Sequence, residues 1–135
     1  MESRPQAEKK LSVMLVDDDE DWLLLMQSWL GLKDLDVSTN CNGRQIIEDV
    51  KNVRPDLILL DVHMKEVNGE AICRLIKSDS DIRTIPLYML SSDIRVGEIA
   101  RNCGAEGSIS KAMPIGEMTE RIGFLAANSV NSNAR

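Results

Sequence analysis

The sequence predicts an α/β fold with a doubly wound, five-stranded parallel sheet, and three observations support this prediction. Five strand signals alternate with five helix signals along the 135 residues. The connections between them are short, which implies right-handed βαβ crossovers with helices on both faces of the sheet. The third run, Leu57 to Leu60, is apolar at four consecutive positions, as expected of a strand that is buried on both faces.

The first part of the chain is expected to hold a tail, a strand and a helix. Residues 1–10 are polar and are expected to form a flexible tail before a strand over 11–16. Asp19 or a neighbour can cap a helix over 20–30, which Gly31 can end. The apolar residues of this helix are spaced so as to predict one buried face; they are Trp22, Leu25, Met26 and Trp29.

The middle of the chain continues the alternation. A short strand is expected over 35–38, and the next helix begins near Asn42-Gly43 and is stopped by Pro55. The third strand covers 56–60, and a loop over 62–68 follows it. The third helix has a helical pattern of apolar residues, namely Ala71, Ile72, Leu75 and Ile76.

The last part supplies two more strands and two more helices. A strand over 85–90 is followed by a weaker helix over 94–103, then by a strand over 107–109 and a helix over 115–127. Residues 128–135 are expected to be a polar tail or a linker, so that one domain covers 11–127. Whether the chain is a natural single-domain protein or a piece of a longer one stays open at this point.

Composition narrows the class of protein. With 16 Lys and Arg against 22 Asp and Glu, the net charge is −6, which disfavours nucleic acid as a partner because phosphate binding requires clustered positive charge. No apolar run approaches the ~20 residues of a membrane span, and the first ten residues lack the apolar centre of a signal peptide. A cytoplasmic protein without a membrane partner is therefore expected.

Cys41, Cys73 and Cys103 are odd in number and far apart in the chain. This spacing predicts neither a disulfide framework nor a zinc site, and the three thiols are expected to be inert and at least half-buried.

Carboxylates follow two of the predicted strands directly. Asp17, Asp18 and Asp19 follow the first strand, and Asp61 follows the third. In open α/β sheets ligands bind at the carboxyl ends of the strands, so these acids are expected to converge there. Two such charges about 4 Å apart repel by roughly 4 kcal/mol at an effective dielectric constant of 20. The cluster therefore requires a cation, and Mg²⁺ prefers oxygen ligands of this kind.

The same edge collects further groups that suit phosphoryl transfer. Ser91 and Ser92 follow the fourth strand, and Lys111 follows the fifth. With a metal bound, one carboxylate can act as a nucleophile toward phosphorus, while a lysine and a hydroxyl neutralise the phosphoryl oxygens. Phosphoryl transfer onto Asp61 is the reaction that this set of residues predicts.

Taken in order, these features resemble the receiver domain of two-component response regulators. They are the acidic pair after the first strand, the segment PDLILLD at residues 55–61, the hydroxyl after the fourth strand and the lysine after the fifth. Each motif is weak alone, but the four occur on the expected elements at family-like spacings. The resemblance covers residues 11–127 and implies the (βα)5 flavodoxin-like receiver fold.

The resemblance also implies a role for each residue. Asp61 would be the phosphoacceptor, and Asp17 and Asp18 would hold Mg²⁺ together with Asp61 and the backbone carbonyl of His63. Ser91 and Lys111 would contact the phosphoryl group. The donor would be a sensor histidine kinase or a histidine phosphotransfer protein, and the signal would pass to an unknown downstream protein target. Such a domain is a signalling module that catalyses only its own phosphorylation and dephosphorylation.

The chain departs from the family pattern in three places. Ala112 follows Lys111 where the family commonly has a proline after a cis bond, and a cis bond before a non-proline residue costs about 2.5–4 kcal/mol. Ser108 stands where regulators often carry the Tyr or Phe that swings inward on activation. Lys65 and Glu66 replace residues that are usually proline and glycine. The loop around Lys111 and the output switch are therefore open questions.

Other interpretations remain. The chain could be a degenerate receiver that binds partners without taking phosphate, with Ser91 an ordinary turn hydroxyl and Lys111 a surface lysine. Asp19 alone is better explained as a helix cap, and the ring of His63 as a loop side chain facing solvent. The segment 16–19 also resembles the DxD motif of haloacid-dehalogenase-like phosphatases. Those enzymes need a later acidic pair, for which this chain offers only Glu117 and Glu120 on a helix.

Overall fold

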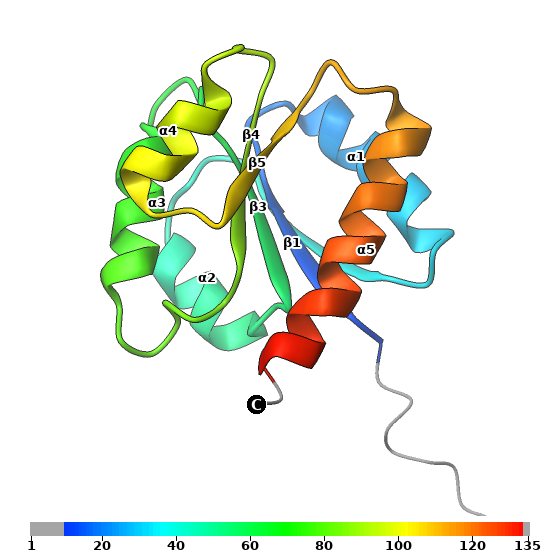
Figure 1. The fold of residues 1–135 in the computed structure, drawn as a ribbon, viewed down its shortest axis with the longest axis horizontal. Helices are drawn as coiled ribbons and strands as arrows, with labels where there is room; N and C mark the ends of the chain where they lie inside the picture. Colours follow the sequence, from blue (N-terminus) through cyan, green and yellow to red (C-terminus); the bar gives the residue numbers. More distant parts are fainter. Residues whose placement is uncertain (1–9, 134–135) are drawn as a thin grey trace, which may run out of the picture.

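A computed structural model describes residues 10–133, and its five strands form one parallel sheet between two layers of helices (Figure 1). The sheet has the order β2-β1-β3-β4-β5. Its strands are β1 (Ser12–Val16), β2 (Asp36–Asn40), β3 (Leu57–Asp61), β4 (Leu87–Ser91) and β5 (Gly107–Ser110). The predicted fold class is confirmed. The tail predicted over 1–10 lies, apart from its last residue, outside the described residues.

The helices cover both faces of the sheet. α1 (Glu20–Gly31) and α5 (Ile115–Asn133) lie on one face, and α2 (Ile46–Val53), α3 (Gly69–Ser78) and α4 (Val96–Cys103) lie on the other (Figure 1). The strand order reverses between β1 and β3, and such a switch point opens a crevice at the carboxyl ends of the two strands. No helix within residues 10–133 combines the length and hydropathy that crossing a membrane requires.

Alternate side chains of the central strands enter two separate cores. Every residue of β3 is buried, as its unbroken apolar run predicts. Leu57 and Leu59 pack beneath α1 and α5, whereas Ile58 and Leu60 pack beneath the other three helices. The strand that carries Asp61 is therefore fixed from both sides.

The buried face of α1 differs from the predicted one. Leu23, Met26 and Leu30 are buried, whereas Leu25 is 48% exposed and Trp29 is 38% exposed. The sequence is apolar at all five positions from 22 to 26, so two adjacent faces of the helix satisfy the helical spacing equally well. Packing against the sheet buries the face that carries Leu23, Met26 and Leu30.

The helices near the carboxyl end also have different limits. α4 begins at Val96, and Ile94, expected inside it, is 98% exposed. α5 continues to Asn133, so residues 128–133 are helical rather than a tail. Two polar side chains at the start of this extension bond within the helix and so support its continuation. Asn128 donates to the carbonyl of Phe124, and the buried Ser129 hydroxyl donates to that of Ala126.

The cysteines follow the prediction in two cases of three. Cys73 and Cys103 are buried, and burial raises the pKa of the Cys73 thiol. Cys41 is exposed, so the expectation that all three thiols would be at least half-buried was wrong for this residue. It lies in the connection between β2 and α2, beyond the cover of either core.

Candidate functional site

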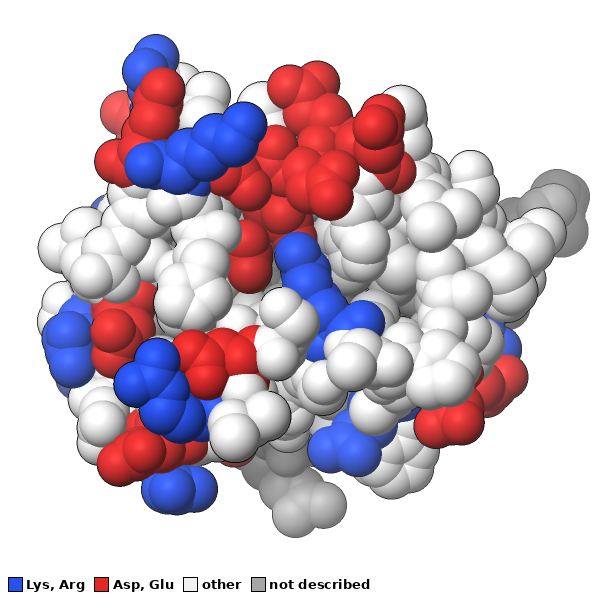
Figure 2. Space-filling view, turned by 90° about the horizontal axis from the view of Figure 1, so that it is seen from above, with Lys and Arg blue, Asp and Glu red and all other residues white. Residues whose placement is uncertain are grey.

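The predicted acidic residues meet at the carboxyl ends of β1 and β3. Val16 pairs with Leu60 in the sheet, so the next residues, Asp17 and Asp61, lie at neighbouring strand ends. Both are buried, and together with Asp18 they place carboxylate oxygens within 4.8 Å of one another. Figure 2 looks down on this end of the molecule and shows acidic side chains gathered there beside a basic one.

The hydrogen bonds of these acids involve one oxygen of Asp17 and one of Asp18. Asp17 Oδ1 accepts the N–H of Asp19 at 2.9 Å, and Asp18 Oδ2 accepts the N–H of Lys65 at 2.7 Å. Asp17 Oδ2 is buried and has no hydrogen-bond partner among the described residues. Asp19 caps α1 through the N–H of Trp22, at 3.0 Å, and does not belong to the cluster.

Lys111 reaches this cluster from the end of β5. Its Nζ lies 2.5 Å from Asp17 Oδ2 and 3.8 Å from Asp61 Oδ1, and neither ion pair has hydrogen-bond geometry. The peptide bond between Lys111 and Ala112 is trans. The Lys111 N–H donates to the carbonyl of Ser91, which fixes the lysine backbone against β4. A proline is therefore unnecessary for directing this side chain inward.

Ser91 is buried at the end of β4, whereas Ser92 is exposed. The Ser91 hydroxyl accepts the N–H of Asp93 at 2.9 Å. The His63 ring is mostly exposed, as predicted for a loop side chain, and its Nε2 lies 3.5 Å from Asp93 Oδ2. Asp93 is also bonded by Arg95, which holds the pKa of the Asp93 carboxyl far below its usual range.

The electrostatic field of the site makes ionisation of Asp61 difficult. Burial and then the charge of Asp17 raise its pKa from 3.8 to about 6, whereas Lys111 and the N–H of His63 lower it. The donor set consists of carboxylate oxygens, and a buried one, Asp17 Oδ2, makes an ion pair with Lys111 but no hydrogen bond among the described residues. Hard oxygen ligands of this kind fit Mg²⁺, so the residues present suit the predicted ion. The His63 carbonyl as a further ligand stays a prediction.

Gly69, the first residue of α3, is a part of the site that sequence reasoning missed. A Cβ at this position would lie 2.3 Å from the carbonyl oxygen of Asp61 and 2.8 Å from Cα of Val62. Only glycine allows α3 to start so close to the end of β3. Asn68 caps α3 through the N–H of Glu70, but the close approach of Gly69 depends on the tertiary fold.

Comparison with known proteins decides the family. Residues 13–123 match the family model for the response regulator receiver domain. The chain belongs to this family. It is a receiver domain of the two-component response regulators, and the haloacid-dehalogenase and degenerate interpretations are not favoured.

Curated relatives place this receiver domain in proteins of different length. It is 30% identical over 113 residues to the polar-differentiation response regulator DivK of Brucella anthropi, which covers 82% of this chain and 92% of that protein. It is 31% identical over 112 residues to the protein RcaC of Microchaete diplosiphon, which covers 82% of this chain and 17% of that protein. The chain thus spans nearly all of one relative and less than a fifth of the other.

Solved structures agree with this assignment. The signal receiver domain of a signal transduction histidine kinase from Syntrophus aciditrophicus superposes with a TM-score of 0.75 at 29% identity, covering 87% of this chain and 90% of that one. The BeF3-activated N-terminal receiver domain of RstA from Klebsiella pneumoniae gives 0.75 at 25% identity, covering 85% and 97%. The receiver domain is a signalling domain of a family that interacts with histidine kinases and downstream effectors.

Proposed function

We propose that this receiver domain accepts a phosphoryl group on Asp61, in a Mg²⁺-dependent transfer from a histidine kinase or a histidine phosphotransfer protein. The observation that supports this most directly is the position of Asp61. It ends a fully buried strand, beside a second buried carboxylate and within 3.8 Å of a lysine ammonium group. An acid placed only for stability would not be buried next to a like charge.

The transfer is a displacement at phosphorus. A carboxylate oxygen of Asp61 forms the new O–P bond, and the P–N bond to the donor imidazole breaks. The electron pair of that bond returns to the ring nitrogen. Mg²⁺ bound by Asp17, Asp18, Asp61 and the His63 carbonyl would supply charge neutralisation for the phosphoryl oxygens.

Two protein groups remain available for those oxygens. The Lys111 ammonium group is held between Asp17 and Asp61 and can shift toward the new phosphoryl charge. The Ser91 hydroxyl accepts a bond from Asp93, which leaves its own proton free for donation. Hydrolysis of the acyl phosphate by water would then return the domain to its resting state, so that its catalysis is confined to its own phosphorylation and dephosphorylation.

The donor protein would approach over α1, which begins at the site. This helix exposes apolar side chains on its outer surface, and Leu32 directly after it adds another; they are Leu24, Leu25 and Leu32. An apolar helix surface next to an acidic site suits a helical partner that presents a phosphohistidine. We assign the exchange to the cytoplasm, and we infer a downstream protein target rather than nucleic acid from the net charge of −6.

The intact mass of the protein after incubation with Mg²⁺ and acetyl phosphate tests the proposal. The wild type should gain one phosphoryl group, and Asp61→Asn should gain none while keeping its fold. Asp34→Asn is a matched control, because Asp34 is exposed and its φ of 62° suits asparagine.

Uptake by Asp61→Asn equal to that of the wild type would move the nucleophile to Asp17 or Asp18. No uptake by the wild type, from acetyl phosphate or from a panel of histidine kinases, would favour a receiver that binds partners without phosphate.

A further inference from the structure

Lys111 lacks the proline that usually follows this lysine, yet its side chain is well directed. A lysine side chain has four rotatable carbon bonds and loses much conformational freedom when it is held in one place. Asp17 attracts Nζ at 2.5 Å and Asp61 at 3.8 Å, but neither contact has the angles of a hydrogen bond that would fix the direction of the side chain. A further contact, made with the face of a ring, would restrict the side chain beyond these two ion pairs.

The indole of Trp22 provides that contact. Lys111 Nζ lies 4.6 Å from the centroid of the Trp22 ring, which is within the range of a cation–π interaction. The Lys111 side chain is only 20% exposed, so the attraction acts in a partly desolvated site, where it is stronger than at an open surface. Within residues 10–133, the ammonium group of Lys111 and the indole of Trp22 form the cation–π pair at the carboxylate cluster.

Trp22 is itself held in place by the element that carries the acids. Its backbone N–H donates to Asp19 Oδ1 in the first turn of α1, and its ring packs at the edge of the core beneath α1 and α5. The connection from β1 to α1 therefore positions both Asp17 and the indole. Their relative placement does not depend on the loop that follows β5.

From this arrangement we propose that Trp22 is a positioning residue, whose indole holds Lys111 beside Asp17 and Asp61. The inference rests on the proposed function, because it assigns the lysine to the phosphoryl group. Nζ lies between Asp17 at 2.5 Å and Asp61 at 3.8 Å, with the ring as a third neighbour. The ammonium group can move from one carboxylate toward a phosphoryl group on the other while it stays in contact with the ring.

The test compares uptake rates from acetyl phosphate among tryptophan variants. Trp22→Leu should lower the rate constant of uptake about 2- to 5-fold, which is the range of one cation–π contact. Trp22→Phe should restore much of the rate, because the ring face is kept. Trp29→Leu should leave it unchanged, since Trp29 lies two turns further along the same helix and Lys111 stacks on the Trp22 ring instead.

A double variant separates positioning from general stability. In a Lys111→Met background, which is expected to slow uptake by less than Asp61→Asn, the further change Trp22→Leu should have no effect on the rate. Equal rates for the wild type and Trp22→Leu would overturn the proposal, as would a Trp22→Leu effect that persists without the lysine. If Trp22→Leu folds poorly, Trp22→Met carries the same comparison.

An NMR measurement keeps this inference distinct from the proposed function. The ε-methylene protons of Lys111 should be shifted upfield by the indole ring in the wild type and in Trp29→Leu, and not in Trp22→Leu. If the wild type takes no phosphoryl group, the proposed function fails while this shift still decides whether the contact exists. An unshifted Lys111 resonance in the wild type would overturn the positioning role.

Discussion

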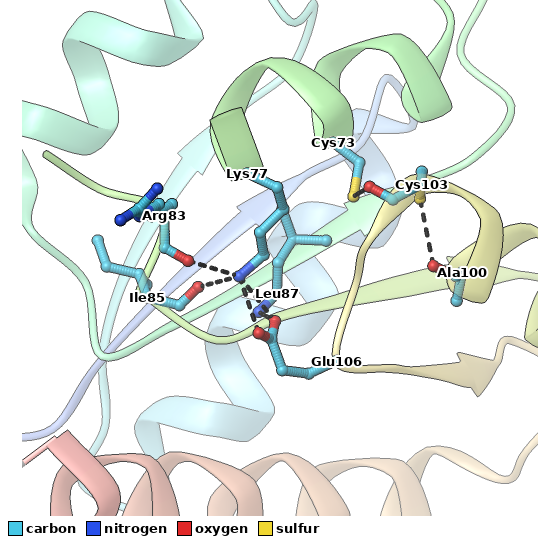
Figure 3. Close-up of polar contacts among 8 residues, drawn as sticks. All are labelled: Cys73, Lys77, Arg83, Ile85, Leu87, Ala100, Cys103 and Glu106. Carbon is cyan, nitrogen blue, oxygen red and sulfur yellow. Dashed lines mark hydrogen bonds and ion pairs between the residues drawn. The ribbon is translucent and has the colours of Figure 1, made fainter. Parts of the chain in front are cut away.

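Two lysines, each paired with a carboxylate, lie at opposite ends of the sheet and differ in the hydrogen bonds that their ammonium groups make. Lys77, 12% exposed, donates to the carbonyls of Arg83 at 3.0 Å and Ile85 at 2.9 Å. It also lies 2.8 Å from Glu106 Oε1, which accepts the N–H of Leu87 (Figure 3). These bonds join the end of α3 to the starts of β4 and β5, so the lysine stabilises the packing of three elements.

Lys111, at the carboxyl ends of the strands, has no comparable set of bonds. It faces two carboxylates without hydrogen-bond geometry, and one buried oxygen of Asp17 has no hydrogen bond among the described residues. Burial next to Asp17 raises the pKa of Asp61 to about 6. A lysine that is fully hydrogen-bonded to its neighbours thus serves the fold, whereas a lysine among crowded carboxylates marks the place where a ligand or a new charge is expected.

The largest effect is expected on the pH dependence of stability without metal. Because the folded pKa of Asp61 is raised from 3.8 to about 6, its ionisation disfavours the folded state. The stability that its neutral form provides is complete below the unfolded pKa of 3.8 and is lost as pH rises to about 6. A shift of this size corresponds to at most about 3 kcal/mol. Asp61→Asn should therefore be more stable than the wild type at pH 7, and the difference should shrink toward pH 4.

Urea unfolding in EDTA at several pH values measures this difference. Asp34→Asn, which alters an exposed acid, should follow the wild type at every pH. If the free energies of unfolding of Asp61→Asn and the wild type differ by the same amount from pH 4 to pH 7, the pKa of Asp61 is not raised by its surroundings.

The second largest effect is expected on stability when the hydrogen bonds of Lys77 are removed. Lys77→Met should lower the free energy of unfolding by about 2 kcal/mol, because two carbonyls and a partly buried carboxylate lose their donor. Phosphoryl uptake by the folded fraction should be unchanged, since this cluster lies at the other end of the strands. Lys10→Met is the control, because the ion pair of Lys10 with Asp34 is exposed and worth less than about 1 kcal/mol. Equal losses in both variants would show that the Lys77 bonds add nothing to stability.

The features that were predicted well from sequence are those that depend on neighbours along the chain. The burial of β3 follows from four consecutive apolar residues, and Asp61 stood out because it directly follows that run. Lys111 stood out because it comes just after the fifth predicted strand. The parallel sheet then brings these strand ends together without further information.

The features that were missed depend on contacts between distant segments. The buried face of α1 was ambiguous because five successive apolar positions allow two faces, and only packing on the sheet selects Leu23. The Trp22 contact joins helix α1 to the end of β5, and the tight fit of Gly69 is set by the path of β3. A sequence pattern contains no signal for either of these contacts.

The smallest effect is the stabilisation by Mg²⁺, and it tests only the carboxylate cluster of Asp17, Asp18 and Asp61. An ion that binds only the folded protein stabilises it by about 1.4 kcal/mol at ten times its dissociation constant. The melting temperature should therefore rise with millimolar Mg²⁺ in the wild type and in Asp34→Asn. Asp17→Asn should lose most of the rise, because it removes a buried ligand whose Oδ2 is free of hydrogen bonds among the described residues. Lys77→Met should melt lower but keep the full rise, since its bonds are remote from the acids. An equal rise in Asp17→Asn would place the ion elsewhere, and the repulsion among Asp17, Asp18 and Asp61 would then have no bound metal to offset it.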